Sequence, residues 1–128
     1  MLTLVAAAIL SFMIFFPLVV ATSVFKVLDE KQSSKFLRIF FPKYYIYGFV
    51  LSVIGLTLSI YYENKLSMLI FLLIMVGFVF SRQVLMPIIN KSKDLGDESK
   101  FNKLHKFSVF INFLQIMGSI VLLVTYLK

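Results

Sequence analysis

The last apolar stretch of the chain, residues 107–127, reads FSVFINFLQIMGSIVLLVTYL and contains no charged side chain. A helix needs about 20 such residues to cross the hydrocarbon core of a bilayer. Three further apolar runs precede it, at about residues 2–28, 43–62 and 66–87, and the fourth helix is expected to begin near residue 101. The sequence therefore predicts an all-α integral membrane four-helix bundle, with residues 1–128 forming one membrane domain.

Composition supports this class of protein. Hydrophobic residues make up 60% of the chain and charged residues only 15%, which is too little charge for the surface of a soluble domain. The first run lacks a positive segment before it, so we expect it to be a retained span and not a cleavable signal. The chain has no cysteine, which excludes disulfides and thiolate metal sites. No basic solvent-facing domain remains that would bind nucleic acid.

Positive charge is distributed unevenly between the connections. Eleven of the thirteen basic residues flank or occupy the first and third connections, and two lie on the other side: Lys26, Lys31, Lys35, Arg38, Lys43, Arg82, Lys91, Lys93, Lys100, Lys103 and Lys106 against Lys65 and Lys128. Because positive loops stay cytoplasmic, we predict a protein of the inner (cytoplasmic) membrane with both termini outside. The same charges would attract anionic lipids at the cytoplasmic face.

The connection between the first two spans has an amphipathic character of its own. Ser33 or Ser34 can cap a helix that sets apolar side chains against Lys35 and Arg38. Pro42 follows and removes a backbone donor. We therefore expect a short interfacial helix that is interrupted or kinked before the second span.

One face of the fourth span is polar. His105, Ser108, Asn112, Gln115 and Ser119 recur at spacings of three and four residues, which places them on one side of a helix. Polar side chains that face lipid tails are costly, so this stripe is expected to point into the protein interior or a cavity.

Arg82 is the only charged residue well inside the third apolar run. Counting inward from the third connection places it level with Ser108 and Asn112, and no acidic residue lies at that depth. The predicted candidate ligand-binding cluster is Arg82, Gln83, His105, Ser108, Asn112 and Gln115, with Tyr45 or Tyr47 contributing from the second span. The Arg82 guanidinium can snorkel to the interface, hydrogen-bond to helix groups or bind an anionic ligand.

Small residues form two further rows that are typical of close helix packing. They are Gly48, Ser52, Gly55 and Ser59 in the second span, and Gly77 and Ser81 in the third. We expect both rows to act in helix packing.

Motifs for catalysis and metal binding are weak. His105 is the only histidine, so a haem iron would need methionine as its second axial ligand. A zinc or copper site lacks further ligands, and no Ser–His–acid set can form because the spans contain no acid. No catalytic or metal-binding residue is predicted, and the cofactor remains unknown, with haem as one alternative.

Three motifs carry a resemblance to a known family. They are residues 40–45 (FFPKYY), the segment from Arg82 to Asn90 around Met86-Pro87, and Phe-x-x-x-His-x-x-Ser-x-x-x-Asn at residues 101–112. In this order they resemble a family of small four-span proteins, classed as a domain of unknown function, that includes a human transmembrane protein linked to cisplatin resistance. The layout is more distantly similar to the HemJ type of protoporphyrinogen oxidase and the CopD copper-resistance type. This chain has no histidine in its first span, where the HemJ type is expected to hold haem.

Three classes of function stay open at this point. The sequence favours a non-enzymatic binding or accessory component of a membrane complex, in a homo-oligomer or with other membrane subunits. A haem-binding or HemJ-like membrane oxidoreductase is the second class. A small-solute or metal-handling transporter is the third, and it requires a homo-oligomer because four spans are few for a complete pathway.

Overall fold

The computed structural model describes residues 2–126, which are helical almost throughout and contain no strand in that range. The elements in chain order are α1 (Leu2–Phe15), η1 (Phe16–Ala21), α2 (Thr22–Val27), α3 (Glu30–Tyr61), α4 (Lys65–Phe80), η2 (Ser81–Leu85), α5 (Met86–Asp94) and α6 (Glu98–Tyr126). Each η segment is π-helical and joins the helices on either side of it into one continuous helix. The described chain therefore forms four long helical rods, Leu2–Val27, Glu30–Tyr61, Lys65–Asp94 and Glu98–Tyr126. Each rod is long and apolar enough to cross a membrane, which confirms the predicted all-α four-helix class.

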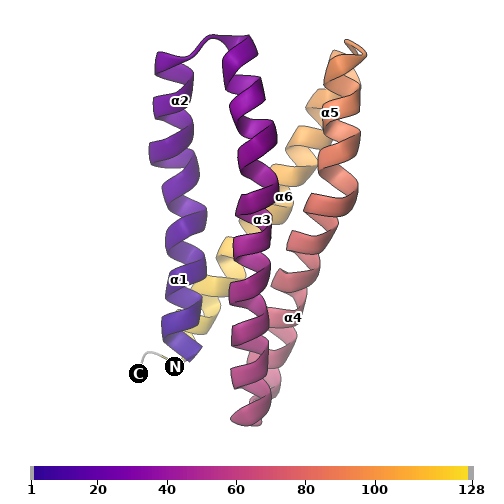
Figure 1. The fold of residues 1–128 in the computed structure, drawn as a ribbon. Helices are drawn as coiled ribbons and strands as arrows, with labels where there is room; N and C mark the ends of the chain where they lie inside the picture. Colours follow the sequence, from indigo (N-terminus) through magenta and orange to yellow (C-terminus); the bar gives the residue numbers. More distant parts are fainter. Residues whose placement is uncertain (1, 127–128) are drawn as a thin grey trace.

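Both ends of the chain lie at the same end of the molecule (Figure 1). The turn between α3 and α4 is at this lower end as well, whereas the α2–α3 and α5–α6 connections lie at the upper end. The two basic connections therefore share one end of the bundle. This placement is what a common cytoplasmic location requires, and the orientation in the membrane stays a prediction.

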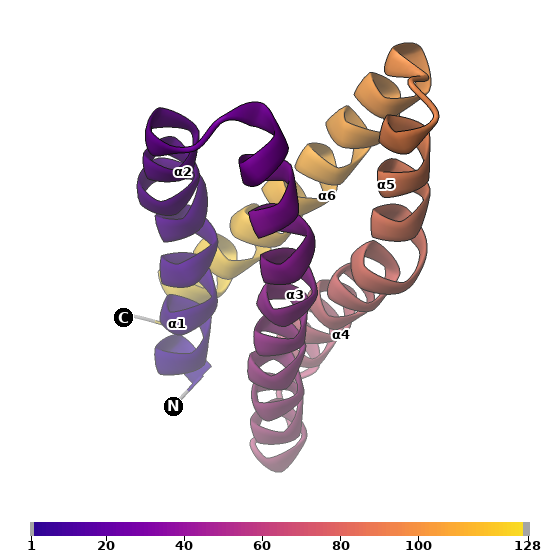
Figure 2. The same ribbon diagram turned by 45° about the horizontal axis from the view of Figure 1, so that its top comes forward.

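The rods do not run parallel along their full length. α6 crosses behind the other helices, from α5 at the upper end to α1 at the lower end (Figures 1 and 2). It packs against α1, α4 and α5, and α3 packs against α1 and α4. The molecule is consequently a closed four-helix bundle in its lower half, whereas α2 and the first half of α6 diverge above it.

The predicted short interfacial helix is not a separate element. Asp29, with an extended backbone, accepts a hydrogen bond from the Gln32 N–H at 2.7 Å and so caps a single helix that runs to Tyr61. Pro42 lies within this helix. A proline removes one backbone hydrogen bond, and the helix continues through that loss. The expectations of a cap at Ser33 or Ser34 and of an interruption at Pro42 were therefore wrong, and the alternative of a kink at Pro42 stays a prediction.

A proline lies in or just after each of the two π-helical segments. Pro17 lies in η1, and Pro87 follows η2 by two residues. In η2 the Met86 N–H donates to the Ser81 carbonyl, five residues earlier. Single π turns inside α-helices are frequent at functional sites. In η1 the Thr22 hydroxyl satisfies the Leu18 carbonyl at 2.7 Å.

The third and fourth rods extend further at the upper end than the apolar runs alone indicated. α5 continues past Pro87 to Asp94, and α6 begins at Glu98. Between them Gly96 adopts a φ of 72°, a left-handed conformation that glycine reaches without strain. Asp97 accepts a hydrogen bond from the Lys100 N–H at 3.1 Å and so caps α6.

The contact between α3 and α4 is built from small residues on α3 and phenyl rings on α4. A Cβ on Gly48 would lie 2.5 Å from the Phe78 ring, and one on Gly55 would overlap the Phe71 ring. Ser52 and Ser59 lie between and beyond these glycines, fully buried, and each hydroxyl donates to a carbonyl of its own helix. The row Gly48, Ser52, Gly55 and Ser59 thus forms the notch that receives two aromatic side chains.

Candidate functional site

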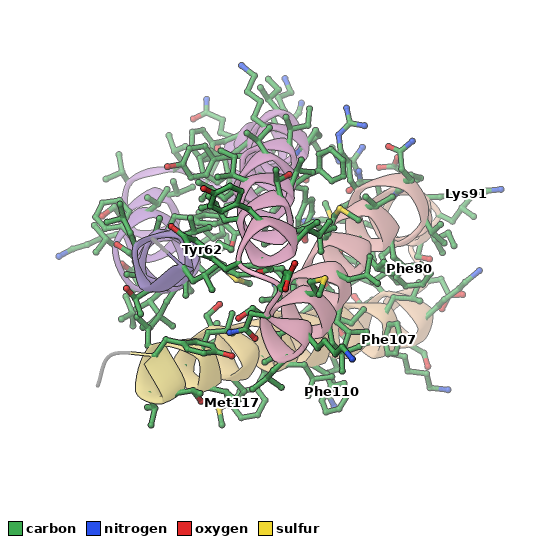
Figure 3. All side chains as sticks on the ribbon, turned by 90° about the horizontal axis from the view of Figure 1, so that it is seen from below. Tyr62, Phe80, Lys91, Phe107, Phe110 and Met117 are labelled. Atoms are coloured by element: carbon green, nitrogen blue, oxygen red, sulfur yellow. The ribbon has the colours of Figure 1, made fainter. Side chains whose placement is uncertain are left out.

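The polar residues of α6 lie mainly on its inner side. Ser108, Gln115 and Ser119 are buried, whereas Phe110 and Met117 on the opposite face point away from the bundle (Figure 3). The stripe at spacings of three and four therefore faces the other helices for most of its length. This arrangement places hydrogen-bonding groups in a bundle whose outer surface is apolar.

Gln115 occupies a niche that Gly77 creates on α4. Its Nε2 donates to the Ile74 carbonyl at 2.9 Å, and a Cβ on Gly77 would lie only 2.6 Å from that nitrogen. The absent side chain of Gly77 is what lets the amide approach the α4 backbone. Ser81 follows Gly77 by one turn and so lies on the same face, toward α6.

A second group of polar side chains lies one to two turns above Gln115. The Tyr45 side chain on α3 is 1% exposed, and its hydroxyl lies beside Ser108 and Asn112 of α6. The Tyr45 ring also packs near Phe78, with 6.3 Å between ring centroids. We call Tyr45, Ser108 and Asn112 the polar cluster. It joins the second and fourth rods in the interior of the molecule.

Several buried polar atoms lack hydrogen-bond partners, and most of them lie near this level. Across residues 2–126 these atoms are Ser67 Oγ, Ser81 Oγ, Arg82 Nε, Asn112 Oδ1 and Gln115 Oε1. Four of the five belong to the region where η2, α4 and α6 meet. An unpaired buried polar group costs about 1–3 kcal/mol, so native proteins supply such groups with water, an ion or a ligand.

Arg82 lies beside this region but bonds elsewhere. Its Nη1 donates to Gln83 Oε1 at 2.6 Å, on the partly exposed side of η2. Arg82 also follows Phe78 by one turn, and Phe78 faces α3. Among the described residues no hydrogen bond joins the guanidinium to Ser108 or Asn112, so the structure gives no direct link between Arg82 and the polar face of α6.

His105 is the outermost member of the predicted stripe. It is exposed and stacks on Phe101 of its own helix, with ring centroids 6.0 Å apart and planes 6° apart. The divergence of α6 from α1 at the upper end leaves His105 outside the bundle. Within residues 2–126 no group of three His, Cys, Asp or Glu side chains is arranged to hold a metal ion.

The predicted cluster of six thus separates into three parts. Ser108, Asn112 and Gln115 face the interior, Arg82 and Gln83 form a pair on η2, and His105 lies apart. Tyr45, which the sequence offered only together with Tyr47, is the residue that completes the interior group. A signal in the sequence distinguishes Tyr45 from Tyr47. Tyr45 lies at helical spacing from the small residues, on the row Phe41-Tyr45-Gly48-Ser52, and Tyr47 does not.

The family model for a domain of unknown function, DUF4149, matches residues 4–98. The chain belongs to this family. No curated protein and no solved structure gives a significant match to the chain. The likeness to the human transmembrane protein and to the HemJ and CopD types therefore stays a prediction.

The matched range covers the first three rods, including Tyr45, Gly77 and Arg82, and ends at the first residue of α6. Ser108, Asn112 and Gln115 lie beyond it. Membership of the family consequently rests on the first three rods, whereas the polar residues of α6 are supported by the geometry of this chain alone.

Proposed function

We propose that this protein is a non-enzymatic, multi-pass membrane protein that binds the polar part of a ligand at the polar cluster, as an accessory component of a membrane complex. The observation that carries the proposal is the buried Oδ1 of Asn112, which has no hydrogen-bond partner in a side chain that lies beside the Tyr45 hydroxyl. A buried acceptor without a donor is stabilised when a ligand supplies one.

The chemistry of the unpaired atoms narrows the ligand class. Asn112 Oδ1 and Gln115 Oε1 are both acceptors, and the Ser81 hydroxyl can also accept. A ligand with hydroxyl or amine hydrogens would satisfy them, and the apolar helices around them would hold an apolar remainder. An amphipathic small molecule or a lipid with a hydroxyl or amine group combines both features.

The test is purification in mild detergent followed by mass-spectrometric identification of the small molecules that travel with the protein. Asn112→Leu is expected to lose the ligand, because it replaces the unpaired acceptor by an apolar group of similar size. Ser119→Ala serves as the matched control, since the Ser119 hydroxyl already bonds to the Gln115 carbonyl at 3.0 Å. Equal ligand content in both variants and the wild type would contradict the proposal.

Two further variants separate the alternatives that the sequence left open. Arg82→Gln releases the ligand only if the guanidinium binds an anionic group of it. A haem protein would show a Soret band that His105→Ala abolishes, whereas the binding proposal expects no such band. A transporter of four spans requires a homo-oligomer, so native mass spectrometry of the purified protein distinguishes it from a monomeric accessory subunit.

The proposal places the protein in the inner membrane, with both termini outside and both basic connections in the cytoplasm. Support comes from the shared end of the two basic connections and from the positive-inside rule. Because the chain contains no cysteine, single cysteines at Glu63 and at Gly96 can be labelled separately. A membrane-impermeant thiol reagent applied to intact cells should modify Glu63→Cys and spare Gly96→Cys; the opposite pattern would reverse the orientation.

A further inference from the structure

A polar groove lies at the upper end of the molecule, between the first turns of α3 and the end of α5. It encloses about 640 Å³ and is open to the surface. Its lining combines four basic and three acidic residues with one serine: Asp29, Glu30, Lys31, Ser34, Lys35, Arg38, Lys93 and Asp94. None of these residues belongs to the polar cluster, so a ligand in the groove is independent of the proposed function.

Two of the three carboxylates in the groove are already engaged. Asp29 accepts the Gln32 N–H as the cap of α3, and Asp94 accepts both terminal nitrogens of Arg38, at 3.1 and 2.5 Å. The second of these nitrogens also lies 3.4 Å from the Asn90 carbonyl. Arg38 thereby joins α3 to α5 across the floor of the groove and is itself neutralised.

In contrast to Arg38, the three lysines that line the groove form no salt bridge in the part of the chain that the structure describes. Within the described residues Arg38–Asp94 is the one salt bridge, so Lys31, Lys35 and Lys93 have no carboxylate partner. Lys93 contacts the ring of Phe101 at 5.7 Å, a weak interaction at an exposed site. Lys31 and Lys35 are one turn apart and so project from the same side of α3, with Ser34 beside them. A ligand in the groove therefore meets three lysine charges without an ion-pair partner and two carboxylates without one, those of Asp29 and Glu30, so that positive charge is in excess by one.

The length of α3 indicates where the groove lies relative to the membrane. Its 32 residues extend for about 48 Å at about 1.5 Å per residue, whereas the hydrocarbon core of a bilayer is about 30 Å thick. With the Tyr61 end at the lower interface, the first turns of α3 project beyond the core. The groove then lies among the lipid headgroups, directly above exposed apolar residues of α3 such as Ile39.

We propose that this groove binds a phosphate group carried by an anionic lipid. Lys31 and Lys35 supply the charge from α3, Lys93 supplies it from α5, and the Ser34 hydroxyl offers a neutral donor. Phosphate oxygens accept charge-assisted hydrogen bonds from such ammonium groups. The acyl chains of the lipid would follow the apolar surface below the groove.

The experiment is native mass spectrometry of the full chain in detergent, titrated with phosphatidylglycerol and separately with phosphatidylcholine. Each basic residue near an anionic surface contributes a free energy equivalent to about a fivefold change in affinity. Lys31→Gln and Lys35→Gln should each weaken phosphatidylglycerol binding about fivefold, and the double variant about thirtyfold. Phosphatidylcholine, whose choline cation offsets its phosphate, should bind more weakly to the wild type.

Two control variants make the test specific for the groove. Lys43→Gln removes an exposed lysine of the same helix that does not line the groove, and it should leave binding unchanged. Glu30→Gln removes one of the two carboxylates that have no ion-pair partner and should strengthen binding several-fold, a change that damage to the fold would not produce. Helical circular dichroism of every variant verifies that the fold is kept.

Inorganic phosphate added as a competitor separates the two sources of the phosphate group. Displacement of phosphatidylglycerol by millimolar phosphate supports a site that recognises the phosphate itself, free or lipid-bound. Persistence of the lipid, together with its loss in the Lys31 and Lys35 variants, supports a site for the intact lipid. The proposal is overturned if the groove variants behave like Lys43→Gln, or if Glu30→Gln weakens binding.

Discussion

Two helix–helix contacts of this molecule, here called seams, are alike in their small residues and differ in the side chains that fill them. The α3–α4 seam has glycine and serine on one side and the rings of Phe71 and Phe78 on the other. The seam between α4–η2 and α6 has Gly77 and Ser81 on one side, and it receives the amide of Gln115. In the first seam Ser52 and Ser59 of α3 bond to their own helix, and Ser67 at the start of α4 is the buried serine there without a partner. In the second seam the Ser81 hydroxyl and the Gln115 Oε1 both lack a partner.

The difference shows that a row of small residues predicts close contact between two helices. It does not predict which side chain fills that contact or what the side chain does there. In the α3–α4 seam a glycine gives room to an aromatic ring, and dispersion and packing are the result. In the α4–α6 seam a glycine gives room to an amide, and unpaired polar atoms remain around it. The proposed function gives the first seam a role in stability and the second a role in binding. Substitutions in each should separate the two roles.

The largest effect on stability is expected from Phe71→Ala. The Phe71 ring is fully buried in the Gly55 notch, and its removal leaves a cavity between α3 and α4. Substitutions of buried phenylalanine by alanine cost about 3–5 kcal/mol of the free energy of unfolding. Thermal unfolding in detergent, followed by circular dichroism, measures the loss. The control Leu73→Ala, at a 61% exposed position, should cost far less; equal losses would contradict the packing role of the seam.

Gly55→Ala should have a smaller effect of the same sign. The new Cβ would overlap the fully buried ring of Phe71. Overpacking of this kind costs about 1–3 kcal/mol. Gly118→Ala is the matched control, because a Cβ there would meet nothing closer than the Cγ2 methyl of Ile70, at 3.2 Å. If Gly55→Ala is as stable as Gly118→Ala in the same unfolding assay, the aromatic notch is not the close contact described.

Gln115→Met should have the smallest effect on stability. It removes one hydrogen bond to the Ile74 carbonyl, worth about 0.5–1.5 kcal/mol, and at the same time removes an unpaired buried acceptor. The two contributions oppose each other, so the free energy of unfolding should change by less than about 1 kcal/mol. A loss as large as that of Phe71→Ala would show that the polar seam stabilises the fold, and its assignment to binding would be wrong.

Most of the fold could be predicted from the apolar runs, because a bilayer requires spans of one length and composition. The π-helical turns at Pro17 and near Pro87 could not, since periodicity does not tell whether a proline ends, bends or widens a helix. The continuity of α3 was missed for the same reason. A capping signal was nonetheless available: Asp29 precedes Gln32 by three residues, the spacing of a capping box.

The candidate site was predictable only in part. Spacing alone identified the inward face of α6, because 3.6 residues per turn fixes which side chains share a side. It could not locate Arg82, since the position of an arginine relative to a neighbouring rod depends on how that rod is rotated and tilted. It also did not foresee that α6 diverges at its upper end, which leaves His105 exposed while Ser108, one turn away, is buried.

The polar face of α6 lies against Gly77 in the interior of the bundle. Disulfide formation tests it directly, because the chain contains no cysteine of its own. A pair introduced as Gly77→Cys and Gln115→Cys should cross-link under mild oxidation in the membrane, whereas Gly77→Cys with Phe113→Cys should not, since Phe113 is on the exposed side. Cross-linking of the Phe113 pair, with none of the Gln115 pair, would contradict the account.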